Sequence, residues 1–132
     1  MNNSFKNAVL IKSFLFLLIV LWGGYNATSL GFKPGENLIT DVGNLLFMVF
    51  SVFYLLNAFF LFKFMSLGSK TYLPLILLFI VLGFISEVLN PMQINRDYFY
   101  LVIFYVVSPL FFITQGMVLS MLISKSFREK FQ

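Results

Sequence analysis

Residues 42–62 read VGNLLFMVFSVFYLLNAFFLF and contain no charged side chain. As an α-helix this stretch would be about 31 Å long, which is enough to cross the hydrocarbon core of a bilayer, about 30 Å thick. Asp41 precedes the stretch and Lys63 follows it, so the nearest charges lie at its two ends. The sequence therefore predicts a membrane-spanning helix here, with Thr40 or Asp41 as its N-cap.

The same pattern occurs three more times along a chain with 60% apolar and only 11% charged residues. In soluble domains about 25% of the residues are charged. Short connections place consecutive helices side by side in antiparallel pairs. We therefore expect residues 1–132 to form one domain, an all-α integral membrane protein that is an antiparallel bundle of four transmembrane helices. The expected spans are about 8–27, 42–62, 72–89 and 98–124.

The few charged residues alternate in sign from one side of the expected membrane to the other. One set of segments carries a single acidic residue, Glu129, and seven of the nine basic residues. These basic residues are Lys6, Lys12, Lys63, Lys70, Lys125, Arg128 and Lys130. The opposite loops carry Lys33, Glu36, Asp41, Glu87, Arg96 and Asp97. Because Lys and Arg are enriched in cytoplasmic segments, we expect both termini in the cytoplasm and, by default, a bacterial inner membrane.

The first apolar stretch also resembles a signal peptide, with Lys6 and Lys12 before the apolar run Phe14–Leu21. A clear cleavage site does not follow, since Tyr25 would occupy the −3 position if Ala27 were at −1. We therefore expect the stretch to remain as the first span. Lys12 would then lie one turn inside the start of the helix, with its ammonium group reaching the inner head groups.

The chain has no Cys and no His. Their absence excludes disulfides, thiol redox chemistry and metal sites built from these residues. A Gly-rich phosphate loop, paired carboxylates and a nucleophile elbow are also missing from the sequence. We expect no cofactor, no metal and no enzymatic activity. Nucleic acid is not an expected partner, because the basic residues flank apolar stretches instead of forming one face.

Polar side chains within the expected spans are the first candidates for function, because polar groups are costly in lipid. Counting residues from the helix ends places Asn26 and Glu87 near the outer surface, and pairs Asn57 with Gln115 in the inner half. Glu87 is either a proton- or cation-linked carboxylate or a solvated head-group residue that helps to set topology or bonds Asn26. Asn57 and Gln115 either line a polar path or link helices by hydrogen bonds. Asn90-Pro91 is expected to end the third span, and Asp97 is a candidate N-cap for the fourth. Pro109 is expected to kink the fourth span.

Small residues at intervals of four are candidates for close helix packing, because they let two backbones approach. We expect these contacts within the bundle, with a partner, or with lipid. The candidates are Gly23, Gly24, Gly116, Ser120 and Ser124.

The sequence favours a non-catalytic accessory or assembly subunit of a larger membrane complex. The expected partners are the lipid bilayer and a membrane protein or a second copy of the chain. One alternative is a small oligomeric transporter or channel with Glu87 as its coupling carboxylate. Another is an immunity protein that blocks a pore-forming toxin through helix contacts. A membrane enzyme ranks fourth, since such enzymes usually display clustered acids, His or Arg.

Overall fold

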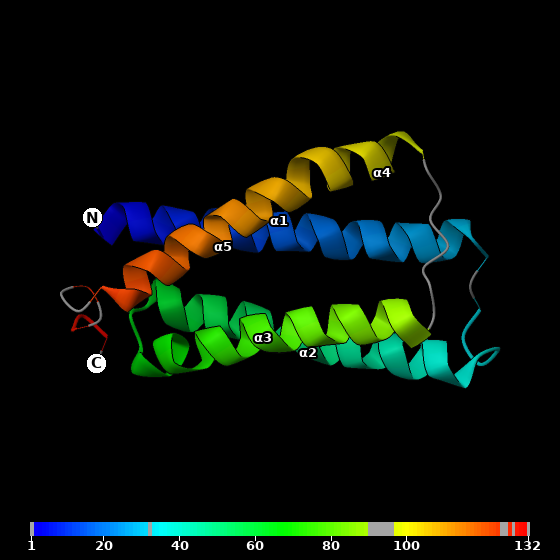
Figure 1. Cartoon of the computed structure of the whole chain (residues 1–132), viewed down its shortest axis with the longest axis horizontal. Helices are drawn as coiled ribbons and strands as arrows, with labels where there is room; N and C mark the ends of the chain where they lie inside the picture. The colour runs from blue at the N-terminus through cyan, green and yellow to red at the C-terminus, as the bar shows by residue number, and fades with distance from the viewer. Residues whose placement is uncertain (1, 32, 90–96, 125–126, 128, 132) are drawn as a thin grey trace.

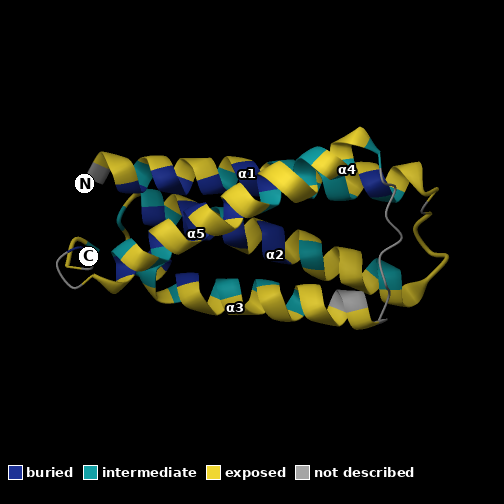
Figure 2. Ribbon diagram, turned by 45° about the horizontal axis from the view of Figure 1, so that its top comes forward, coloured by how far each residue is buried: buried dark blue, intermediate teal, exposed yellow. Residues whose placement is uncertain are grey.

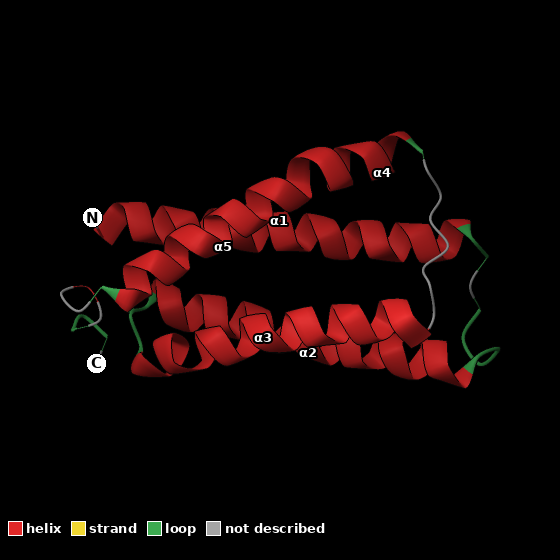
Figure 3. Cartoon of the chain, in the orientation of Figure 1, coloured by secondary structure: helices red, strands yellow, loops and turns green. Residues whose placement is uncertain are grey.

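The structure, a computed structural model, describes residues 2–31, 33–89, 97–124, 127 and 129–131. Side chains are described for all of these residues except Asn2, Ser86, Glu87 and Leu89. Within this part of the chain the regular elements are all helical (Figure 3). They are α1 (Asn2–Ser29), α2 (Leu38–Phe62), α3 (Ser66–Leu89), α4 (Tyr98–Val102), the π-helical turn η1 (Ile103–Val107) and α5 (Ser108–Ile123).

Four helices in the described residues are long and apolar enough to cross a membrane, which confirms the all-helical class. They are α1, α2, α3 and the rod that α4, η1 and α5 form together. Helices α1 and α3 begin at Asn2 and Ser66, about six residues before the expected spans. The apolar stretches are therefore shorter than the helices, because polar flanking residues continue the helical backbone. The expected end of the third span at Asn90–Pro91 lies outside the described residues.

The N-cap of α2 is Asn37, not Thr40 or Asp41 as the sequence predicted. The side-chain oxygen of Asn37 accepts hydrogen bonds from the backbone N–H groups of Ile39 and Thr40, at 3.0 and 3.4 Å. Asp41 lies in the first turn instead, where its carboxylate accepts a hydrogen bond from the N–H of Gly35 and suits the helix dipole.

The N-cap prediction for the fourth span is confirmed. The Asp97 side chain accepts a hydrogen bond of 2.9 Å from the N–H of Tyr100 at the start of α4. Further along the same rod, Pro109 has no N–H for the carbonyl group of Tyr105. The backbone accommodates this through the π-helical turn, in which the N–H of Ser108 bonds the carbonyl of Ile103.

Helix α1 packs against α2 and against the α4–η1–α5 rod, and α2 also packs against α3 (Figure 1). The two ends of the chain lie at the same end of the bundle, together with the α2–α3 turn. Helix α3 and the rod diverge from there toward residues 89 and 98. Consecutive long helices are therefore antiparallel.

Burial divides the bundle into two halves (Figure 2). The closed half, residues 5–16, 50–72, 107–124 and 127, holds the buried apolar side chains of both core clusters. The open half consists of residues 17–29, 38–49, 73–88 and 98–106. Among the side chains described in the open half, only that of Asn26 is buried.

The α2–α3 turn holds Phe64 in a left-handed conformation with φ 56°. The N–H of Phe64 bonds the carbonyl of Leu61, and the N–H of Met65 bonds that of Phe60, which is a Schellman motif. Glycine usually occupies this position, because a Cβ is strained there. Phe64 instead contributes its ring to a terminal aromatic cluster.

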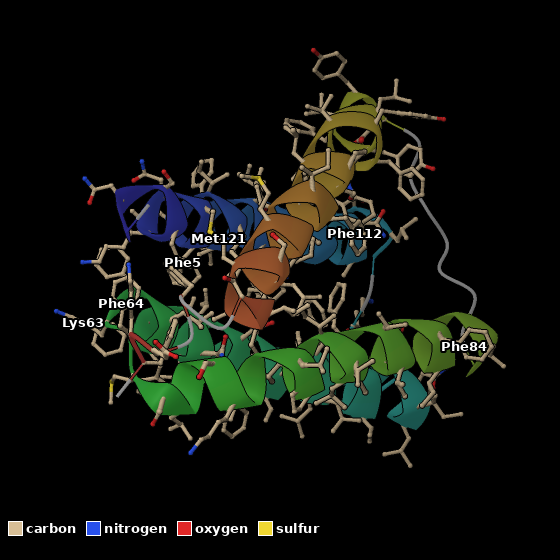
Figure 4. The ribbon with its side chains drawn as sticks, turned by 60° about the vertical axis from the view of Figure 1, so that its left-hand side comes forward. Phe5, Lys63, Phe64, Phe84, Phe112 and Met121 are labelled. Carbon is tan, nitrogen blue, oxygen red and sulfur yellow. The ribbon has the colours of Figure 1, made fainter. Side chains whose placement is uncertain are left out.

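The terminal aromatic cluster joins α1, the α2–α3 turn and the segment after α5. The ring centroid of Phe64 lies 5.5 Å from that of Phe5, 5.9 Å from that of Phe127 and 5.3 Å from that of Phe131. Figure 4 shows Phe5 and Phe64 pointing toward each other at this end, with Phe84 at the far end of α3. Aromatic pairs at such distances contribute roughly 0.5–1.5 kcal/mol beyond area burial, which offsets the strained backbone.

Helices α2 and α3 come closest at Gly68. A Cβ at this position would lie 2.7 Å from the backbone nitrogen of Leu61 and 2.9 Å from the carbonyl carbon of Phe60. Only glycine fits between the two backbones there. Gly68 thus makes the kind of close approach that the sequence predicted at other small residues.

Candidate functional site

Lys12 is fully buried, with 0% of its surface exposed. Helix α1 begins at Asn2, so Lys12 lies about 15 Å along the helix and not within its first turn. Its ammonium nitrogen lies 4.4 Å from the ring centroid of Tyr54 and 4.9 Å from that of Tyr72. The prediction that Lys12 extends to the head groups is therefore wrong, because its side chain enters the bundle between α2 and α3.

Gln115 connects the same two tyrosines from α5. Its side-chain nitrogen donates a hydrogen bond to the hydroxyl group of Tyr54. The hydroxyl of Tyr72 donates to the side-chain oxygen of Gln115, and it lies 3.1 Å from the main-chain oxygen of the same residue. Lys12 completes the arrangement by donating to the Tyr54 hydroxyl at 3.3 Å. Each of the four long helical units therefore contributes one residue to a polar node: Lys12, Tyr54, Tyr72 and Gln115.

The polar node surrounds the amine nitrogen of Lys12 with two tyrosine rings and no described carboxylate. No ion pair joins Lys12 to an acidic side chain among those that the structure describes. A desolvated ammonium group over an aromatic ring gains about 2 kcal/mol. Burying an ion costs several kcal/mol, and the two rings and one hydrogen bond together offset a cost of similar size. A buried ionisable side chain in the middle of an apolar helix is a candidate functional residue by default.

Asn57 lies one helical turn from Tyr54 and links α2 to α3. Its side-chain nitrogen donates to the carbonyl oxygen of Gly68 and to the hydroxyl of Thr71, both at 2.8 Å. Its side-chain oxygen is buried without a hydrogen-bond partner. Asn57 and Gln115 lie in the same half of the bundle, but they bond other residues and not each other.

The structure separates the other two polar candidates from the node. Asn26 is buried in α1, within the open half. Glu87 belongs to the last turn of α3, and its side chain lies outside the described part of the molecule. The predicted bond between Asn26 and Glu87, and the role of Glu87, therefore stay predictions.

The three glycine candidates make no close contact with another helix of the chain. A Cβ added at Gly23, Gly24 or Gly116 would meet no atom of a neighbouring element within 4 Å. Ser120 and Ser124 are exposed on α5 and at its C-cap. Their contact with a partner or with lipid stays a prediction.

No family model, curated protein or solved structure matches this chain. Its function must therefore be argued from its own residues.

Sequence reasoning missed Lys12, Tyr54 and Tyr72 as members of a site. Lys12 was counted with the loop charges, although it lies at helical spacing on one face of α1 with five buried residues. These neighbours are Phe5, Ala8, Val9, Leu15 and Phe16. The sequence alone does not reveal this inner face, because Leu10, Ile11 and Phe14 on the outer faces of α1 are equally apolar.

The node can hold a positive charge or a proton in the buried core, and its hydroxyl and amide groups can adjust to either state of the lysine. The described residues contain no group of three or more His, Cys, Asp or Glu side chains placed to hold a metal ion. The chemistry available in the described core is therefore proton and hydrogen-bond exchange at Lys12, Tyr54, Tyr72 and Gln115.

Proposed function

We propose that the chain is an integral protein of a bacterial inner membrane, with four spans and both termini in the cytoplasm. We further propose that it is a non-catalytic accessory or assembly subunit of a larger membrane complex. Insertion is supported by the four apolar helices and by the outward-facing apolar side chains along them. The orientation is supported by the basic residues, because the chain ends and the α2–α3 turn lie at one end of the bundle.

The observation that carries the proposal of an accessory role is the exposure of α3. Only 11% of its apolar stretch is buried inside the bundle, compared with 28–33% in the other three long helical units. Leu73, Ile80 and Phe84 are all exposed along α3, although Tyr72 and Phe79 on its other face contact α5. A span with so large an exposed apolar face offers that face to a helix of another protein.

The proposal of an assembly role is tested by purification of the tagged full chain in a mild detergent, followed by mass spectrometry. A stable, larger membrane partner is expected with the wild-type chain. Ile80→Trp should lower its recovery, whereas the matched Ile11→Trp on α1 should not, since Ile80 and Ile11 are similarly exposed at 55% and 50%. Recovery of the lone chain or of a homo-oligomer would rule out the accessory role.

Orientation is tested separately with a reporter inserted in the turn between α2 and α3. A cytoplasmic reporter signal is expected at residues 63–66. A signal from the opposite side would reverse the assignment of both termini.

A second candidate function is a small charge-coupled transporter, and the polar node favours it. Lys12 would then be the coupling group, in place of Glu87, because Lys12 is buried between four helical units. Ion or proton flux into proteoliposomes decides between the two functions. Flux that is lost in Lys12→Met and kept in Glu87→Gln would support the transporter, and absence of flux with the wild-type chain would exclude it.

A further inference from the structure

The hydroxyl group of Tyr54 lies between two nitrogen atoms. One is the side-chain nitrogen of Lys12 at 3.3 Å, and the other is the side-chain nitrogen of Gln115. If both nitrogens donate to the hydroxyl oxygen, its own hydrogen has no acceptor among the described residues, and an unbonded buried donor is unfavourable. An ammonium group can only donate, whereas a neutral amine has a lone pair that accepts. The charge on Lys12 therefore decides the direction of its bond with Tyr54.

With a neutral amine at Lys12, the four residues of the polar node form one chain of hydrogen bonds with a single direction. The hydroxyl of Tyr72 donates to the side-chain oxygen of Gln115, whose nitrogen donates to Tyr54. The hydroxyl of Tyr54 then donates to the nitrogen of Lys12, across the same 3.3 Å. Both hydroxyl hydrogens have acceptors in this state.

With an ammonium group at Lys12, the same chain must run in the opposite direction. Lys12 donates to Tyr54, so Tyr54 must donate to Gln115. A turn of about 180° about the last torsion of Gln115 exchanges its oxygen and nitrogen, which have nearly the same shape. The amide nitrogen then donates to Tyr72. The hydroxyl of Tyr72 donates in turn to the main-chain oxygen of Gln115, which lies 3.1 Å away and is the acceptor that the reversed chain requires.

The surroundings of Lys12 are compatible with both states. Helices α2 and α3 present Tyr54 and Tyr72, whose ring centroids lie 4.4 and 4.9 Å from the lysine nitrogen. Helix α5 presents the neutral amide of Gln115, and no carboxylate that the structure describes bonds the node. Lys6, on the same helix as Lys12, lies over aromatic rings at the end of the bundle. The two tyrosine rings stabilise the ammonium group, and burial stabilises the neutral amine.

We propose that Lys12 is a reversible proton-binding site, and that proton uptake reverses the chain of hydrogen bonds from α1 through α2 and α5 to α3. The proton comes from water and returns to water, and both tyrosines keep their own hydrogen in each state. The amide of Gln115 is the group that turns. This inference goes beyond both proposed functions, because it requires neither a partner protein nor transport. Failure to find a partner or an ion flux would leave it unchanged.

The experiment follows side-chain NMR signals of the full chain in detergent micelles from about pH 5 to about pH 11. The Cε signal of Lys12 reports proton binding, and the amide signals of Gln115 report its reorientation. Both should change with the same midpoint, and the Gln115 signals should not change with pH in Lys12→Met. The amide of Asn57 is the internal control, because it is buried one turn from Tyr54 but bonds other residues. Its signals should stay constant.

A second variant separates reorientation of the amide from the direct field of the charge. Tyr54→Phe keeps the ring over which Lys12 lies, but it removes the hydroxyl that connects Lys12 with Gln115. Lys12 should still titrate in this variant, and Gln115 should no longer follow it. The matched Tyr98→Phe, at an exposed tyrosine of α4, should leave both titrations unchanged.

Four results would overturn the proposal. A Lys12 signal that stays constant over the whole range would show that the site exchanges no proton. Constant Gln115 signals would show that the chain does not reverse. Gln115 signals that still follow Lys12 in Tyr54→Phe would assign their change to the field of the charge. A change at Asn57 with the same midpoint would assign it to a rearrangement of the whole bundle.

Discussion

The closed and open halves of the bundle are built from the same apolar helices, yet among the described residues only the closed half buries apolar side chains fully. The closed half contains the polar node, the terminal aromatic cluster and the close approach at Gly68. The open half contains large apolar side chains such as Leu21, Leu45 and Phe84, and all three are exposed. Lipid tails solvate such side chains as well as a protein core does, so apolar character alone does not drive helices together in a membrane.

Helix α1 shows the same contrast within one element. Its first half buries Phe5, Val9, Lys12 and Phe16 against other helices. Its second half contacts α4 through aromatic rings, with Trp22 near Tyr100 and the other residues mainly exposed or half-buried. What distinguishes the packed half is specific contacts between side chains: rings at short distance, buried hydrogen bonds and a cation over two rings.

The largest expected difference between the halves comes from a pair of phenylalanines. Phe16 is buried, with its ring centroid 4.2 Å from that of Tyr54, whereas Phe84 is 71% exposed. Phe16→Ala should lower the free energy of unfolding by about 3 kcal/mol, at the low end for buried aromatic residues because lipid replaces water in the reference state. Phe84→Ala should change it by less than about 0.5 kcal/mol.

Both values are measured by unfolding the full chain in mixed detergent micelles. Equal losses in the two variants would mean that the open half is as tightly packed as the closed half. This result would contradict the division of the bundle into two halves.

Two glycines give effects of opposite sign. Gly68→Ala places a Cβ against the backbone of α2 and should cost about 1–3 kcal/mol. Gly83→Ala, in the open half of the same helix, meets no atom within 4 Å and should raise stability by up to about 1 kcal/mol, since alanine is the better helix former. The same micelle assay measures both, and a stabilising Gly68→Ala would show that α2 and α3 are not in close contact.

Lys12→Met tests whether the stability of the closed half depends on a charge at Lys12. Methionine has a similar shape, and the Tyr54 hydroxyl keeps its hydrogen bond from Gln115 in this variant. Replacement of a buried ion by an apolar residue is often neutral or stabilising, so we expect a gain of about 1 kcal/mol. A loss of similar size would show that the cation stabilises the bundle, and it would weaken the argument for a functional lysine.

The smallest expected effect is the coupling between Tyr72 and Gln115. A double-mutant cycle with Tyr72→Phe and Gln115→Leu should give a coupling energy of about 0.6 kcal/mol, the average for hydrogen bonds between membrane helices. The control cycle pairs Tyr72→Phe with Ser120→Ala, because the Ser120 hydroxyl bonds only the carbonyl of Met117 in its own helix. A similar coupling in both cycles would mean that the node has no specific bond between α3 and α5.

The sequence was sufficient to predict four apolar helices and the N-cap at Asp97, because both depend on local composition and spacing. It was not sufficient to predict the node. Tyr54, Tyr72 and Gln115 lie far apart in the sequence, and their apolar neighbours surround each helix on all faces. In a soluble protein an apolar stripe marks the inner face of a helix. These four helices lack a distinct stripe of this kind, because their outer faces are apolar too.

The turn between α2 and α3 was unpredictable for a different reason. The sequence placed Phe64 and Gly68 at or beyond a helix end, where a loop is expected. Phe64 occupies a position that favours glycine, and the ring contacts that compensate its backbone come from residues more than 50 positions away. Such long-range contacts leave no trace in local sequence patterns.

The terminal aromatic cluster also sets the order in which the bundle is assembled during synthesis. The rings of Phe5 and Phe127 lie 4.8 Å apart in space, although 122 positions separate them in the chain. Phe5 therefore emerges from the ribosome long before its partner exists, and α1, α2 and α3 must be held together by other contacts until then. This end of the folded molecule closes only after the fourth long helical unit has been synthesised.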